Sequence, residues 1–153
     1  MAKSGRYFRI PCALAEEVAR EARTRGQPFA AAASEMLEEA VRVRRVPGIV
    51  FADGPTGRRA TLTGTGPDVW EVIATWKAAG ESLSALAEEY PWLAESQLRV
   101  ALRYYETYPR EIDMRLGREE YWTPERVRNE FPFLTPSVYA SQRQSRDMPP
   151  DEC

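Results

Sequence analysis

The sequence predicts a mainly helical protein of the α+β class, with one N-terminal strand, a small β-hairpin and an extended C-terminal tail. Apolar residues recur at helical spacing over residues 14–41 and 68–108. Glycine and proline punctuate the stretch between these regions, and the periodicity is lost from about residue 117. With 153 residues, 43% of them hydrophobic, the chain can bury one ordinary core or two small ones. We therefore expect three segments, 1–45, 46–116 and 117–153.

Positive charge is concentrated at the N-terminus. Residues 1–46 hold nine Lys and Arg against six Glu, although the whole chain has a net charge of −2. We therefore expect any polyanionic partner to bind to this N-terminal segment. The rest of the chain is then available for a different function.

The residue types argue against an enzyme and against a metal or cofactor site. The chain has no His, the commonest general base and metal ligand. Its two cysteines, Cys12 and Cys153, have neither metal-ligand nor disulfide-framework spacing. The glycine-rich "DGPTG" at 53–57 lacks the Lys and the Gly spacing of a P-loop, and a hairpin turn explains it. We predict no catalytic residue, no metal and no cofactor.

The expected location is the cytoplasm, with no membrane contact. No stretch approaches the roughly 18 consecutive apolar residues of a membrane helix. The start "MAKSGRYFRIP" has no apolar core or cleavage site of a signal peptide.

The first segment begins with a predicted strand at 6–10 and continues as two helices. Leu14, Val18 and Ala22 mark the first helix, which Gly26 ends. Pro28 suits the start of the second helix, whose apolar stripe is Phe29, Ala33, Leu37 and Val41. A lone strand needs a distant partner or a second chain.

Pairing of two such strands from two chains would sort their side chains by face. Phe8 and Ile10 would lie on the inner face, and Tyr7 and Arg9 on the outer face. The side chains that we expect this homodimer to bury are Phe8, Ile10, Leu14, Val18, Phe29, Leu37 and Val41. The outer face would form a two-stranded ribbon that fits the major groove of DNA.

Residues 5–45 resemble the ribbon-helix-helix repressors, through a strand ending in "RIP", a helix closed by Gly and a second apolar-striped helix. The resemblance implies operator binding as a dimer, with Tyr7 and Arg9 reading bases and Lys3 and Arg6 beside them. It also implies that backbone amides around Phe29 and Ala30 hold a phosphate.

Two alternatives stay open in this segment. Arg6 and Arg9 could be solvated charges on an edge strand. The cluster "RVRR" at 42–45 is first explained by the helix macrodipole, which favours cations in a last turn, and only second by DNA contact.

The middle segment predicts a hairpin and three helices. The hairpin is built from "GIVF" and "RRATL", and the helices are expected at 68–79, capped by Asp68, at 83–90 and at 94–108. The short turn "YPWL" between the last two helices fits both a DNA-reading helix-turn-helix and an ordinary small bundle, and the architecture favours the bundle. We expect Leu98, Ala101, Leu102 and Tyr105 to face inward, and Trp70, Trp76, Tyr90 and Trp92 to form an aromatic core.

Residues 46–110 resemble the domain-of-unknown-function family 433, through the Gly-rich hairpin, the "GTG" turn and the later "YP.L" turn. The resemblance implies a winged-helix-like domain of the kind found in bacterial antitoxins. If the last helix reads DNA, Gln97, Arg99 and Arg103 are the candidates; the alternative, a solvated face on an acidic domain, is preferred.

The tail from 117 combines prolines, aromatic residues and arginines. This composition suits a segment that folds on a partner's groove. The three-part layout resembles VapB-type antitoxins, and the resemblance implies that the tail wraps a PIN-type ribonuclease toxin, with Arg126 or Arg128 entering its acidic site. The residues expected at that contact are Tyr121, Trp122, Arg126, Val127, Arg128, Phe131, Phe133 and Leu134. Alternatively, Trp122 and Phe131 pack on the chain's own middle segment.

These observations favour an antitoxin of a type II toxin–antitoxin module. Such a protein would neutralise the ribonuclease with its tail and repress its own operon by binding operator DNA as a dimer. The alternative is a stand-alone DNA-binding transcriptional regulator without a toxin partner.

Overall fold

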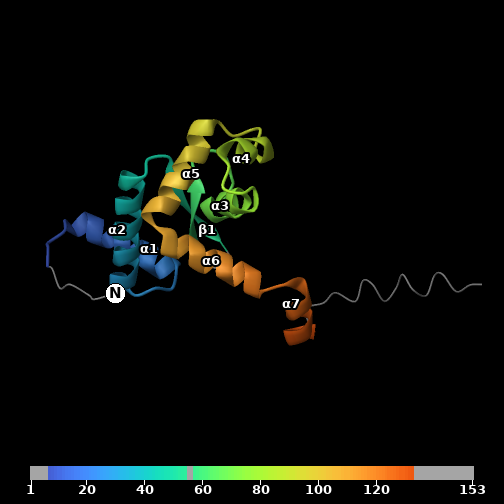
Figure 1. The fold of residues 1–153 in the computed structure, drawn as a ribbon. Helices are drawn as coiled ribbons and strands as arrows, with labels where there is room; N and C mark the ends of the chain where they lie inside the picture. Colours follow the sequence, from blue (N-terminus) through green and yellow to red (C-terminus); the bar gives the residue numbers. More distant parts are fainter. Residues whose placement is uncertain (1–6, 55–56, 133–153) are drawn as a thin grey trace, which may run out of the picture. The chain divides into compact units, whose positions relative to one another are not determined.

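The computed structural model describes residues 7–54 and 57–132, and these confirm a mainly helical protein with one two-stranded hairpin (Figure 1). The chain divides into two compact units, Met1–Pro109 and Arg110–Cys153. The elements of the first unit are α1 (Cys12–Thr24), α2 (Phe29–Arg45), β1 (Ile49–Gly54), β2 (Gly57–Leu62), α3 (Val69–Ala78), α4 (Leu83–Glu89) and α5 (Glu95–Thr107). Helices α6 (Pro109–Tyr121) and α7 (Pro124–Glu130) follow.

Helices α1 and α2 form where the apolar spacing predicts them. Gly26 lies just beyond α1 at φ 63°, a left-handed conformation that glycine adopts at little cost. The Gln27 N–H then donates to the Ala22 carbonyl at 2.8 Å, and the Gly26 N–H donates to the Arg23 carbonyl at 3.1 Å. This pair of bonds is a Schellman ending, and it turns the chain directly into α2.

The predicted strand at 6–10 is absent from the single chain. Residues 7–10 have no regular secondary structure, and Arg6 lies outside the described residues. The physical reason is that a strand requires a hydrogen-bonded neighbour. The two strands of the hairpin pair with each other, in a two-stranded sheet. Pairing with a second chain therefore stays a prediction.

The middle segment confirms the hairpin and the three helices. Strands β1 and β2 pair antiparallel, with Ile49 opposite Leu62 and Gly54 opposite Gly57. Helix α3 contacts β2, α4 and α5, so its buried face is the centre of this segment. The core consists of the buried side chains Val46, Ile49, Ala60, Leu62, Val69, Val72, Ile73, Leu86, Leu93, Leu98, Ala101 and Tyr104.

Two details of the predicted core are wrong. Tyr104 is the fully buried tyrosine of α5, whereas Tyr105 is only partly buried. Tyr104 reaches inward because α2 also packs against α5, a neighbour that the periodicity of α5 alone does not reveal. Trp92 is 65% exposed, since it sits in the turn after α4 and meets only the edge of the Tyr90 ring.

The hairpin is tied to α2 by Arg58 of β2. Its guanidinium donates two hydrogen bonds to the Glu39 carboxylate, at 2.6 and 2.8 Å, and a third to the Phe51 carbonyl at 3.0 Å. Asp53 also accepts from Arg58, at 3.2 Å. The hydrogen bonds that Arg58 donates to Glu39 raise the pKa of Arg58 above its usual value, against the opposing effect of burial.

The C-terminal segment differs most from the sequence prediction. Residues 117–132 are not an extended tail: the predicted boundary at 116/117 falls inside α6, and α7 follows after a short break. Thr123 begins α7 by accepting the Arg126 N–H at 3.2 Å, and Pro124 takes the first helical position, where its missing N–H costs nothing. Reading the prolines only as helix breakers hid this start signal.

Within the ranges that the structure describes, no helix has both the length and the apolar character to span a bilayer.

The Arg58–Glu39 pair should contribute measurably to stability because both side chains are about four-fifths buried. We expect Arg58→Ala to lower the free energy of unfolding by about 2 kcal/mol, as for hydrogen bonds to charged groups. Arg58→Lys should recover little, because an ammonium cannot bind a carboxylate through two parallel bonds. Urea unfolding followed by circular dichroism, at one protein concentration, measures both.

Arg99→Ala is the matched control, since Arg99 pairs with Glu95 on the exposed surface of α5. That change should cost less than about 0.5 kcal/mol. Equal losses for Arg58→Ala and Arg99→Ala would show that the Arg58 contacts do not stabilise the fold.

Candidate functional site

An apolar surface lies exposed on the N-terminal segment of the single chain. Five of the seven side chains expected to be buried in a dimer are largely exposed here, namely Phe8, Leu14, Phe29, Leu37 and Val41, at 44–69%. Val18 is buried and Ile10 is intermediate. We call the five exposed side chains the apolar face.

The interior of the α1–α2 pair is small by comparison. Its buried side chains are Val18, Ala22 and Ala32. Arg25 adds ion pairs to Glu21 on α1 and to Glu35 on α2, both at 2.7 Å. Several large exposed apolar side chains beside so small an interior are typical of an interaction site.

The predicted DNA-contacting residues of the first segment are exposed wherever the structure describes them. Tyr7 is fully accessible and Arg9 is exposed, and Lys3 and Arg6 lie outside the described residues. Phe29 and Ala30 are the first two residues of α2 and are exposed. Their N–H groups have no carbonyl within the helix to donate to, so they can meet an anion.

The three candidates on α5 have different surroundings. Gln97 is engaged at its own helix start, where its Oε1 accepts the Ala94 N–H at 2.9 Å. Arg99 binds Glu95 at 2.6 Å. Arg103 is exposed and forms no ion pair within the described residues.

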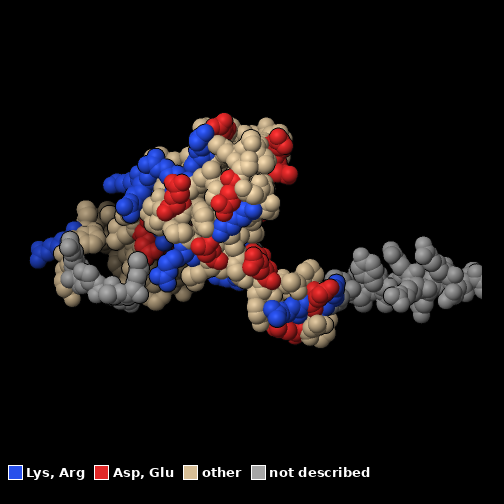
Figure 2. All heavy atoms as spheres, viewed as in Figure 1, with Lys and Arg blue, Asp and Glu red and all other residues tan. Residues whose placement is uncertain are grey.

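The last turn of α2 lies against α5. Arg42 donates to the Tyr104 hydroxyl at 3.4 Å and stands over the Tyr108 ring, 5.1 Å from its centre. Arg42 and Arg45 share a shallow groove with Leu37, Val41 and Tyr108. Figure 2 shows Lys and Arg side chains gathered over this end of α2. Sequence reasoning missed the α2–α5 contact because no local pattern links residues so far apart.

The C-terminal unit contains an aromatic cluster. The Tyr121 and Trp122 rings are 5.1 Å apart, and the Trp122 and Phe131 rings are 5.7 Å apart, measured between their centres. These ring contacts join the end of α6 to the end of α7. Tyr121 and Trp122 nevertheless remain 49% and 38% exposed. Val127 is partly buried on α7.

The two tail arginines have different contacts. Arg126 lies over the Tyr121 ring at 4.2 Å and donates to the Tyr121 carbonyl at 3.2 Å, so it holds the α6–α7 junction. Arg128 is exposed, in the last turn of α7. Phe133 and Leu134, also expected at this contact, lie outside the described residues.

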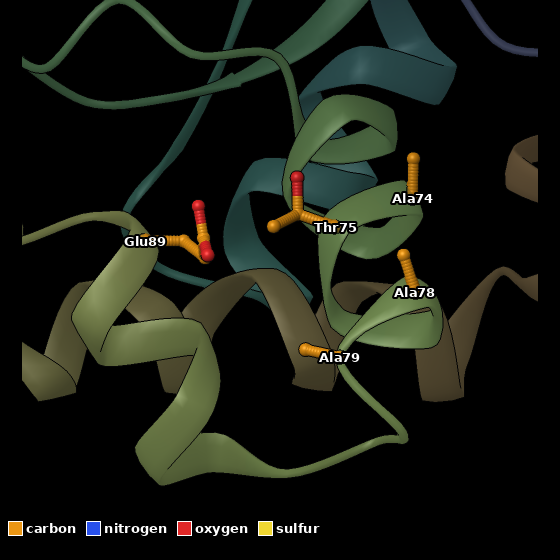
Figure 3. A pocket seen from close by; sticks show the side chains of 5 residues that line it. All are labelled: Ala74, Thr75, Ala78, Ala79 and Glu89. Carbon is orange, nitrogen blue, oxygen red and sulfur yellow. The ribbon is translucent and has the colours of Figure 1, made fainter.

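A surface hollow lies between α3 and α4 (Figure 3). It is lined by Ala74, Thr75, Ala78, Ala79 and Glu89, with the Glu89 carboxylate pointing from the end of α4 toward α3. The Thr75 hydroxyl already bonds the Glu71 carbonyl and the Tyr90 hydroxyl. Among residues 7–54 and 57–132, no three acidic or cysteine side chains stand close enough to hold a metal ion.

Comparison with known protein families finds a similarity in the middle segment. Residues 49–105 match the model of the DUF433 family, described as a protein of unknown function. The match covers the hairpin and helices α3–α5, and it leaves α1, α2, α6 and α7 outside. No curated protein matches the chain, and no solved structure matches it.

Proposed function

We propose that this chain is the antitoxin of a type II toxin–antitoxin module, which binds operator DNA as a dimer and neutralises a PIN-type ribonuclease through its C-terminal unit. The observation that carries the proposal is that two exposed surfaces of different chemistry lie in separate compact units. The apolar face and Arg9 are in the first unit, and the aromatic cluster is in the second. The DUF433 match supports it further, since that family is often associated with toxin–antitoxin-like proteins.

A second copy of the chain is the proposed occupant of the apolar face. Leu14 lies on α1, and Phe29, Leu37 and Val41 follow one stripe of α2. Two copies related by a twofold axis would bury these stripes against each other and bring residues 7–10 of both chains together as paired strands. Phe8 would then leave water, while Tyr7 and Arg9 would stay outside.

Operator contact then follows from the geometry of a strand pair. A two-stranded ribbon fits the major groove, where an Arg can donate two bonds to a guanine edge. The exposed N–H groups at the start of α2 would hold a backbone phosphate, which fixes the ribbon's position on the duplex.

The C-terminal unit is proposed to bind the toxin. Exposed aromatic rings that already support each other lose little side-chain entropy when a partner covers them, which makes them good anchors. The exposed guanidinium of Arg128, beside these anchors, suits the carboxylates of a metal-dependent nuclease.

The alternative function is a DNA-binding regulator that acts without a toxin. The contact between Trp122 and Phe131 favours it, because those rings also complete the local fold of α6 and α7. Both functions are non-catalytic.

The first prediction concerns the dimer. The full-length chain should have twice its mass of 17.4 kDa in analytical ultracentrifugation. Leu37→Glu should give a monomer, because it places two like charges in the centre of the apolar interface. Met114→Glu is the control, since Met114 is 66% exposed on α6. A dimer that survives Leu37→Glu would rule out this face.

The second prediction concerns DNA. Arg9→Ala should weaken binding to a duplex from the promoter of the chain's own gene by roughly tenfold to a hundredfold, as expected for loss of a two-bond contact to a base. The mass of the dimer should not change. Arg118→Ala, an exposed arginine of the second unit, should bind like the unmodified chain. Unchanged affinity in Arg9→Ala would exclude the ribbon from operator recognition.

The third prediction concerns the partner. A tagged full-length chain should capture a ribonuclease, identified by mass spectrometry, from extracts of its native cells. The double change Trp122→Ala and Phe131→Ala should lose it, whereas Trp92→Ala, an exposed aromatic in the first unit, should retain it. Capture of no nuclease by any variant would favour the stand-alone regulator.

A further inference from the structure

Several exposed arginines of the first unit form no ion pair within the described residues. Arg44 and Arg45 lie at the end of α2 and Arg103 lies on α5; the others are Arg9, Arg20 and Arg23. Most arginines around them have a carboxylate partner. Arg42 pairs with Glu38, Arg58 with Glu39, and Arg99 with Glu95. Figure 2 shows Lys and Arg side chains gathered over the end of α2.

Side-chain contacts bring the end of α2, which carries Arg44 and Arg45, close to α5, which carries Arg103. Arg42 contacts Tyr104 and Tyr108, so the last turn of α2 borders the last two turns of α5. A side chain on Gly48, just after α2, would meet Val100 at 3.2 Å. Val100 and Arg103 are three residues apart and share one face of α5. Arg103 therefore flanks the same junction as Arg44 and Arg45.

Helix capping does not account for this charge. A helix macrodipole places about half a negative charge at the C-terminus, whereas α2 ends with Arg42, Arg44 and Arg45. The excess at the end of α2 is therefore positive. Arg103 lies one turn before the end of α5 and forms no ion pair within the described residues, although Glu106 is three residues further along the same helix.

We propose that Arg44, Arg45 and Arg103 form a second DNA-contacting surface, which neutralises backbone phosphates without reading bases. The proposal rests on the proposed DNA binding and adds the middle segment to it. Unpaired guanidinium groups displace the counterions of a duplex, and this displacement supplies most sequence-independent affinity. A contact with backbone phosphates requires a high density of positive charge and does not require a binding pocket.

The test uses the full-length chain and a 30-base-pair duplex of random sequence. Binding is measured by fluorescence anisotropy at several salt concentrations. The variant is Arg45→Gln with Arg103→Gln. The control is Arg110→Gln with Arg118→Gln, which removes the same charge from exposed positions of the second unit.

We expect the variant to lose affinity and salt dependence together. Each lost phosphate contact should reduce the slope of log K against log salt by about 0.9, so the two changes should reduce it by about two. At 0.1 M salt this corresponds to a loss of affinity of roughly fiftyfold. The control should keep the slope and the affinity of the unmodified chain.

Three results would overturn the proposal. A variant with the slope of the unmodified chain would show that these arginines meet no phosphate, while Arg9→Ala could still establish the ribbon. Tighter binding to poly-glutamate than to the duplex, lost in the same variant, would assign the surface to an acidic protein. If the unmodified chain bound no duplex at low salt, both this surface and the proposed operator binding would be excluded.

Discussion

The contacts of Arg58 constrain how the N-terminal helices meet the hairpin. Its two bonds to Glu39 join β2 to α2, and its bonds to Asp53 and to the Phe51 carbonyl join β2 to β1. Arg25 extends the arrangement, since it pairs with Glu35 and lies 3.8 Å from Asp53. The hairpin therefore meets α1 and α2 through paired charges, and α2 meets α5 through Arg42.

This arrangement separates two uses of arginine in the first unit. Arginines that face other elements are held by carboxylates or tyrosine rings, and these contacts fix the geometry of the segment. Arg9, Arg44, Arg45 and Arg103 are exposed and have no such partner within the described residues. A chain with a net charge of −2 can thus still offer local positive charge, because its carboxylates are used to pair the structural arginines.

In the C-terminal unit, aromatic residues both hold two helices together and remain exposed. Phe131 and Trp122 hold α7 against the end of α6, and Arg126 adds a contact to Tyr121. The rings are nevertheless about 40–50% exposed at Tyr121 and Trp122. A preformed cluster of this kind changes the proposed partner contact: the toxin would meet a short helical segment with ordered anchors, in place of a chain that must first fold.

The sequence by itself determined α1 to α5 and the hairpin, because their signals are local. Apolar spacing fixes each helix, Gly26 and Gly80 adopt positive φ directly after α1 and α3, and Asp68 begins α3. The same local logic could have revealed α7 through Thr123 and Pro124, although the surrounding prolines obscured it. The apolar face was also predicted as a set of residues, and the structure shows it exposed in a single chain.

Only the tertiary structure decided which charges pair and which remain available. Nothing in the periodicity of α2 or β2 selects Glu39 for Arg58, and nothing near Arg103 in the sequence places it beside the end of α2. Likewise, nothing in the sequence near Tyr104 indicates that its hydroxyl accepts a hydrogen bond from Arg42 of another helix. Ion pairs and composite surfaces depend on distances between residues far apart in the chain, and those distances are set by packing, whereas caps and helical stripes are set within a few residues.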